Sequence, residues 1–183
     1  MKIKKCKNCR NSSLLNLFSL GDLNFTGKFP KSKSTNINKA HLGLVMCKKC
    51  SLIQLNRSYN LKYLYGPDYG YKTGINKTMR DHMNSIHKML SNKSKLNSGD
   101  YVLDIASNDA TLLNFYNKNI IKVGVDPLVN KYIKCYKNVN YKVSDFFSAD
   151  KLLEKKINKK FKIITALSVF YDVEDPNKFL SDI

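Results

Sequence analysis

The residues of this chain with the most specific chemistry are the cysteines of two C-x-x-C motifs. Cys6 and Cys9 form the first pair, and Cys47 and Cys50 form the second. A two-residue spacer turns both sulfurs of a pair toward one point, so two pairs can supply four thiolates to one tetrahedral zinc ion. Because protein sulfur would fill all four positions, we expect a structural zinc site that leaves no position open for a substrate.

The expected cellular compartment of the chain favours metal binding by these cysteines over disulfide bonds. The basic start of the chain is not followed by an apolar run, so it does not resemble a secretory signal, and we expect a cytoplasmic protein. No apolar stretch is long enough to cross a membrane, so no membrane partner is expected. Paired cysteines in such a chain favour metal, and Cys135 stands alone.

A second group of candidate residues lies in residues 102–111, Val-Leu-Asp-Ile-Ala-Ser-Asn-Asp-Ala-Thr. This segment has the form of a strand, a tight polar turn and the start of a helix. Ligands of parallel sheets bind at the carboxyl ends of strands, where the strand order reverses. We expect the turn to bind a cofactor through its backbone and polar groups, with Asp109 capping the next helix; the residues are Asp104, Ala106, Ser107, Asn108 and Asp109.

Polar residues also follow the next three predicted strands. Asp126-Pro127 is placed to bind both ribose hydroxyls, and Asp145 beside Phe146 suits an adenine ring. Ser168 follows the fourth strand and completes the predicted cofactor site. The turn after the first strand lacks both G-x-G-x-x-G and G-x-x-x-x-G-K-[ST], and therefore has no phosphate cradle. The pattern disfavours NAD and ATP and favours S-adenosylmethionine (SAM), which carries no phosphate.

The elements that must position these residues alternate between strand and helix. This alternation predicts an α/β fold with a parallel sheet and helices on both faces. Strands are expected at 101–105, 120–125, 139–143 and 161–167, and helices at 112–116, 128–136, 149–157 and from 175 onward. An amphipathic helix precedes them, with a packing face made of Ile75, Met79, Met83, Ile86 and Leu90.

We expect three segments along the chain. Residues 1–58 form a small zinc-binding module with short strands at 42–46 and 52–55 and a polar loop at 31–38. Residues 59–98 form an aromatic linker and the packing helix. Residues 99–183 form the first half of a Rossmann-type SAM-binding domain.

The charge balance is strongly basic, with 32 Lys and Arg against 14 Asp and Glu and a net charge of +18. Nearly all of these cations are lysines spread over the whole chain, whereas base-specific nucleic-acid contacts favour arginine. We therefore attribute the positive net charge to lysines on a solvated surface, and we regard a nucleic-acid partner as disfavoured. The alternative is a non-catalytic zinc protein that binds nucleic acid through its lysines.

In these motifs the chain resembles the zinc-containing, SAM-dependent sugar C-methyltransferases of deoxysugar pathways. The resemblance rests on the cysteine pairs and on four further segments in order: LGDLNFTGKFP at 20–30, YGYKTGIN at 69–76, IASND at 105–109 and FYDVEDP at 170–176. It covers nearly the whole chain. Together these matches imply a class I methyltransferase domain behind the zinc module.

The resemblance implies an activity and a substrate class. Family members methylate a ring carbon beside a keto group of a nucleotide-linked sugar, after a base removes the acidic proton. Tyr69 and Tyr71 are candidate pocket residues, with packing aromatics as the alternative role, and no catalytic base is assigned. Of His82 and His87 in the following helix, one is expected to face solvent. Methylation at oxygen or nitrogen is an alternative chemistry.

The chain departs from the family in two respects. Ala110 stands where the family usually has glycine, and its methyl group is expected to reduce cofactor affinity. The family also continues with further strands and a substrate domain, so residues 161–167 are expected to form an apolar edge strand that a second chain or the missing half would cover. We expect little or no methyl transfer by this chain alone, as for a truncated product or one half of a split enzyme.

Overall fold

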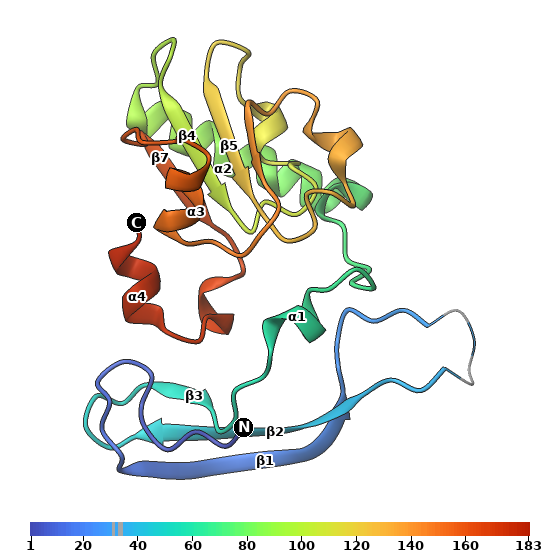
Figure 1. The fold of residues 1–183 in the computed structure, drawn as a ribbon, viewed down its shortest axis with the longest axis vertical. Coiled ribbons are helices and arrows are strands. Elements are labelled where there is room, and N and C mark those ends of the chain that lie inside the picture. The colour runs from blue at the N-terminus through green and yellow to red at the C-terminus, as the bar shows by residue number, and fades with distance from the viewer. Residues whose placement is uncertain (31, 33–34) are drawn as a thin grey trace. The chain divides into compact units, whose positions relative to one another are not determined.

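The computed structural model describes residues 1–30, 32 and 35–183 (Figure 1). The predicted loop at 31–38 lies partly outside the described residues. The chain forms two compact units, Met1–Gly70 with Val173–Ser181 and Tyr71–Asp172 with Asp182–Ile183. The segment predicted at 59–98 is therefore divided between the two units, with 59–70 in the first and 71–98 in the second.

The first unit contains an antiparallel sheet in the order β1-β2-β3 (Figure 1). Its strands are β1 (Leu14–Asn24), β2 (Lys39–Cys47) and β3 (Ile53–Leu55). The strand predicted at 42–46 lies within β2, and the strand predicted at 52–55 includes all of β3, but no strand is predicted over β1. β1 contains two register shifts against β2, which blur the alternation by which a strand is recognised.

Aromatic residues hold the end of the first unit in place. Tyr59 packs edge-on against Phe25, with ring centroids 5.9 Å apart, and its hydroxyl donates to the carbonyl of His41. The ring of Tyr69 covers Gly27, where a Cβ atom would overlap it. Both tyrosines thus pack within the first unit, and the short helix α1 (Leu61–Leu64) lies between them in the chain.

Residues 173–181 attach to the turn that contains the first cysteine pair. Arg10 pairs with Asp175, and Lys7 Nζ donates to the carbonyl of Val173 over 2.9 Å. Asn177 Nδ2 donates to the carbonyl of Asn8 over 2.8 Å. These contacts place α4 (Pro176–Ser181) in the first unit.

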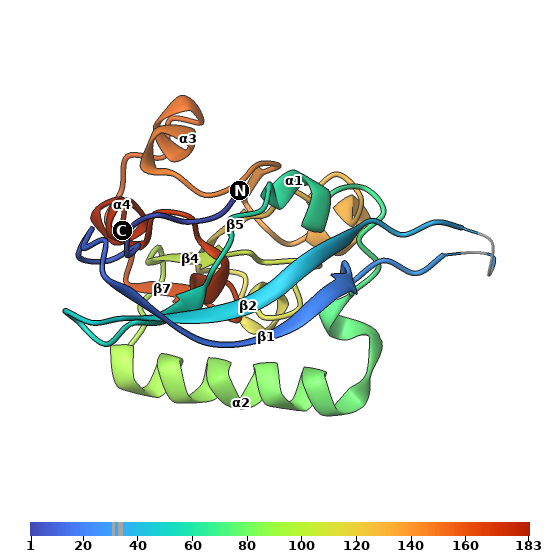
Figure 2. The ribbon, with the colours of Figure 1, turned by 90° about the horizontal axis from the view of Figure 1, so that it is seen from below.

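The second unit begins with the amphipathic helix that the sequence predicts, α2 (Lys77–Ser94) (Figure 2). The side chain of Asn76 caps its start by accepting from the N–H of Met79 over 2.7 Å. Met83 is buried in the hydrophobic core, and its helical neighbours pack around it; these are Met79, Ile86 and Leu90. Ile75 does not belong to this face, because it lies exposed in a 3-10 turn, Thr73–Ile75.

The four strands that follow α2 along the chain are parallel and form one sheet in the order β6-β5-β4-β7. All four strands were predicted, and β7 is an edge strand of the described sheet, as expected. α2 runs along one face of this sheet and α3 (Ala149–Glu154) lies on the other (Figures 1 and 2). The strands are β4 (Tyr101–Ile105), β5 (Ile121–Val125), β6 (Tyr141–Val143) and β7 (Ile163–Ala166).

The helices predicted between the first three strands are wrong. Residues 112–116 form only a 3-10 turn at Leu113–Phe115, and 128–136 form only Ile133–Tyr136. The first residues of both segments are buried, among them Leu113 and Val129, whereas Ile133 is exposed. Asn117 and Asn119 favour a turn that ends the first segment before an α-helix can develop. Among the described residues, no helix is both long and apolar enough to cross a membrane.

We predict that Leu103→Ala destabilises the second unit by about 2–5 kcal/mol, because it leaves a cavity in the core beside β4, an inner strand of the sheet. Leu103 is 2% exposed. Leu153→Ala is the matched control: this leucine of α3 is 54% exposed, and its removal should change stability by less than about 0.5 kcal/mol. Urea unfolding of both variants measures the difference, and similar losses would contradict the assigned core.

Candidate functional site

The two cysteine pairs lie in turns with the same hydrogen bonds. In each turn the residue after the second cysteine donates its N–H to the carbonyl of the first, over 3.1 Å from Arg10 to Cys6 and 2.9 Å from Ser51 to Cys47. Arg10 and Ser51 both adopt positive φ values, 59° and 61°. The sequence offered no sign of this left-handed position, which glycine usually fills.

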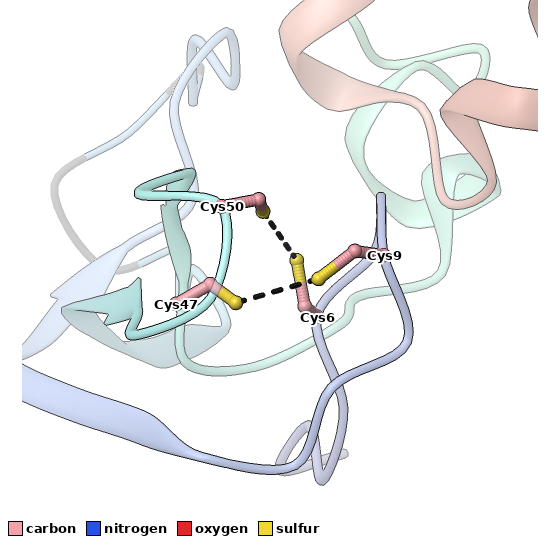
Figure 3. A group of neighbouring side chains, drawn as sticks. All are labelled: Cys6, Cys9, Cys47 and Cys50. Carbon is pink, nitrogen blue, oxygen red and sulfur yellow. Dashed lines mark hydrogen bonds between the residues drawn. The ribbon is translucent and has the colours of Figure 1, made fainter.

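The four sulfurs converge on one point (Figure 3). Cys6 Sγ lies 3.6 Å from Cys50 Sγ, Cys9 Sγ lies 3.5 Å from Cys47 Sγ, and all four sulfurs lie within 4.8 Å of one another. Four zinc–sulfur bonds of about 2.3 Å in a tetrahedron would separate the sulfurs by about 3.8 Å. The cluster therefore fits a metal ion such as zinc, as predicted, and Cys135 is not part of it.

Backbone N–H groups favour negative charge at this cluster. The amides of Cys50 and Lys49 lower the pKa of Cys47 to about 7. Cys9 differs: the amide of Asn11 lowers its pKa, but burial and the neighbouring thiols outweigh it and raise the value to about 11. The two thiols thus differ in how readily they ionise, and a divalent cation at the centre of the cluster would stabilise thiolates there.

The predicted cofactor residues all lie at the carboxyl ends of the parallel strands. The strand order reverses at β4, with β5 and β6 on one side and β7 on the other. Asp104 lies within β4, residues 106–109 follow β4, and Asp126 and Pro127 follow β5. Asp145 and Phe146 follow β6, and Ser168 follows β7.

The loop after β4 has an uncommon backbone. Ala106, Asn108 and Ala110 all have positive φ, at 59°, 48° and 60°. Hydrogen bonds hold the loop against the end of β5: the N–H of Ala106 donates to the carbonyl of Val125 over 2.8 Å. Such strain in non-glycine residues persists only where surrounding contacts determine the backbone.

Asp126 holds the same loop through its carboxylate. It accepts from the N–H of Asn108 over 2.9 Å and from the N–H of Leu128 over 2.7 Å. Burial raises its pKa, while these two donors act in the opposite direction. Each carboxylate oxygen keeps a second lone pair, so the predicted role toward ribose hydroxyls is chemically compatible with these contacts.

Asp109 has a different role from the predicted one. No α-helix follows the turn, so Asp109 caps none; instead it accepts from the N–H of Gly74 over 3.0 Å and from the N–H of Thr111 over 3.2 Å. Ala110 was expected to present its methyl to the ligand. That methyl is fully buried in the hydrophobic core, so it has no surface to offer a ligand.

Residues 71–75, which we call the strap, hold the loop from the other side. The N–H of Thr73 donates to Asn108 Oδ1 over 2.9 Å, and Asn108 Nδ2 donates to the carbonyl of Tyr71 over 3.3 Å. A Cβ atom on Gly74 would overlap Thr111 Oγ1 and Asp109 Oδ2. Sequence reasoning missed Thr73 and Gly74 as partners of the loop; the glycine beside an aromatic segment was the only signal.

Asp104 carries a buried carboxyl group near the carboxyl end of β4. Thr165 Oγ1 on the neighbouring strand lies 2.6 Å from its Oδ1. Burial raises the pKa of Asp104 to about 7, although the hydrogen bond with Thr165 lowers it and nearby Asp126 raises it further. The sequence identified Asp104 as a site residue but gave no indication of Thr165.

The residues predicted to bind adenine, and the serine that follows the fourth strand, are more accessible to solvent than Asp104. Asp145 is half-buried, forms an ion pair with Lys151 over 3.4 Å and accepts from the N–H of Phe146. Phe146 and Pro127 are also half-buried, and Ser168 is exposed with φ 54°.

The candidate tyrosines belong to different units. Tyr69 lies in the first unit, where its ring packs on Gly27 and meets Tyr65 edge-on. Tyr71 lies in the second, in the strap. His82 is exposed, and His87 is half-buried against Phe115 and Tyr116.

A serine–histidine–aspartate arrangement lies on the β1–β2 ribbon. His41 Nε2 is 3.0 Å from Ser19 Oγ, and His41 Nδ1 is 3.2 Å from Asp22 Oδ1. His41 and Asp22 are cross-strand partners, and Asp22 is exposed, unlike the buried aspartate that orients a catalytic histidine. We interpret this arrangement as a surface pairing that stabilises the ribbon.

We predict that the chain binds one zinc ion and that Cys47→Ser abolishes this binding, because a serine hydroxyl is a poor substitute for a thiolate. Cys135→Ser is the matched control and should retain the metal. Elemental analysis measures the metal content, and thermal unfolding before and after chelation measures the stability that the ion contributes. Metal retained by the Cys47 variant would contradict a four-cysteine site.

We predict that stability falls as pH rises from about 4 to about 7, through Asp104. Its pKa is raised from 3.8 to about 7 in the folded chain, so the folded state binds more protons across this window. Asp104→Asn should remove up to about 4 kcal/mol of this dependence. Urea unfolding at several pH values compares the two chains, and parallel curves would contradict the burial of an ionisable group here.

No protein-family model matches the chain, and no curated protein is significantly similar to it.

Proposed function

We propose that the chain is the cofactor-binding part of a SAM-dependent methyltransferase, with a structural zinc ion in its first unit. The observation that carries the proposal is the loop after β4, held between Asp126 and the strap at the point where the strand order of a parallel sheet reverses. Ligands of open parallel sheets bind outside the carboxyl ends at such a point.

Three features favour an adenosyl ligand without phosphate. The turn after β4 has none of the glycines that let a backbone surround a phosphate group. Asp126 and Asp145 offer carboxylates after adjacent strands, suited to ribose hydroxyls and an adenine amino group. Phe146 beside Asp145 offers an apolar face.

When bound, SAM supplies a methyl group activated by its positively charged sulfur. The loop backbone at 106–109 and the carboxylate of Asp126 would hold the cofactor, and the strap would keep that loop in place. The substrate class we propose is a nucleotide-linked keto-deoxysugar, methylated at a ring carbon. We assign no catalytic base within this chain.

The cofactor proposal predicts that SAM binds to the full chain in calorimetric titration and that ATP does not. Asp145→Asn should weaken SAM binding by about 10- to 100-fold, because a hydrogen bond to a carboxylate is worth about 1.5–3 kcal/mol. Asp150→Asn removes the same charge from the exposed first turn of α3 and is the matched control. No heat of SAM binding, or equal loss in both variants, would refute the proposed site.

A further inference from the structure

A cavity of about 390 Å³ lies in the second unit, away from the candidate cofactor site. The last turns of α2, residues 95 and 96, and the segment 116–120 form its walls. Since residues 116–120 lead into β5, the cavity lies at the amino end of that parallel strand, whereas the cofactor residues follow the carboxyl ends. Its volume falls in the range of small-molecule pockets, about 300–1,000 Å³.

Three of the residues that line this cavity each have a buried side-chain atom without a hydrogen-bond partner. The atoms are His87 Nδ1, Ser91 Oγ and the hydroxyl of Tyr116. Only five such atoms occur among the described residues, and three of the five belong to residues that line this one cavity. Buried polar groups are normally paired, and a cluster of unpaired ones marks a place where another molecule supplies the partners.

The unpaired groups are held in position. The ring of Tyr116 meets the ring of His87 edge-on, with centroids 4.6 Å apart, and Tyr116 is only 4% exposed. The backbone carbonyl of Tyr116 accepts from Lys122 Nζ over 3.1 Å, and Lys122 is itself 2% exposed. The side chain of Tyr116 is therefore held in place by its ring and its backbone, while its hydroxyl has no hydrogen-bond partner.

The charge around the cavity favours an anion. No acidic residue lines it, and Lys95 contributes a cation. Burial and the nearby Lys88 lower the pKa of His87, so its ring is neutral and can donate through Nδ1–H. Leu96 and Ile120 add apolar walls. The lining thus combines hydroxyl, imidazole and ammonium donors with an apolar surface.

We propose that this cavity binds a small organic anion, whose carboxylate or phosphate group accepts hydrogen bonds from Ser91, Tyr116 and His87. An apolar portion of the ligand would lie against Leu96 and Ile120. The ligand would bind independently of the cofactor, because the two sites lie at opposite ends of the strands.

The test is an NMR titration of the ¹⁵N-labelled full chain with phenyl phosphate and with benzoate. Benzyl alcohol, which has the same ring and no charge, is the matched probe. We expect saturable shifts at residues 87–96 and 116–120 for at least one anion, and no saturable shifts for benzyl alcohol. The tighter of the two anions identifies phosphate or carboxylate as the preferred group.

Tyr116→Phe provides the matched variant, because it removes the unpaired hydroxyl and keeps the ring that packs on His87. Its fold should be retained, since that hydroxyl has no partner to lose, and anion binding should weaken about tenfold. Tyr141→Phe removes a hydroxyl from the distant strand β6 and should bind as the original chain does. Unchanged affinity in the Tyr116 variant, equal binding of benzyl alcohol, or no saturation with either anion would overturn the proposal.

Discussion

The hydrogen bond from the N–H of Asn108 to the buried carboxylate of Asp126 is the contact on which the second unit depends. It joins the loop after β4 to the end of β5. To reach it, the chain takes positive φ values at Ala106 and Asn108, which favour glycine. The unfavourable backbone is offset because a buried carboxylate gains strongly from two N–H donors. The strap then adds Thr73 as a donor to the side chain of Asn108.

A comparable constraint shapes the first unit. Both cysteine turns adopt a left-handed residue after the second cysteine so that their sulfurs face one point. A small antiparallel sheet with an exposed outer strand has little core of its own. A metal ion at the four sulfurs would supply the missing stability, and the contacts of Lys7 and Arg10 would transmit this order to residues 173–181.

Sequence reasoning succeeded where one local pattern determined the structure. The cysteine spacing predicted the cluster, and apolar runs predicted β4 and α2 because strand and helix periods are strong signals. It failed at Leu113–Phe115, where nearby asparagines favour a turn, and at Asp109, where the outcome depends on a partner distant in sequence. Asp109 looks like a helix cap locally, but Gly74 supplies the N–H that determines its role. Thr165 and Tyr116 were missed for the same reason, since their roles arise only when neighbouring elements pack.

Buried polar groups at the two ends of the parallel sheet differ in whether they have hydrogen-bond partners within the protein. At the carboxyl ends, Asp104, Asp109 and Asp126 all have protein partners, so the loop there is ordered before any ligand arrives. Such preorganisation reduces the entropy that binding must overcome. At the amino end, the hydroxyl of Tyr116 and Nδ1 of His87 belong to rings that pack against each other, but neither atom has a protein partner. A fixed donor without an acceptor destabilises the empty cavity, and a ligand that accepts from it stabilises the folded unit. The two sites that we propose on this sheet would therefore differ in energetics: the cofactor loop is complete before binding, and the cavity would be completed by its ligand.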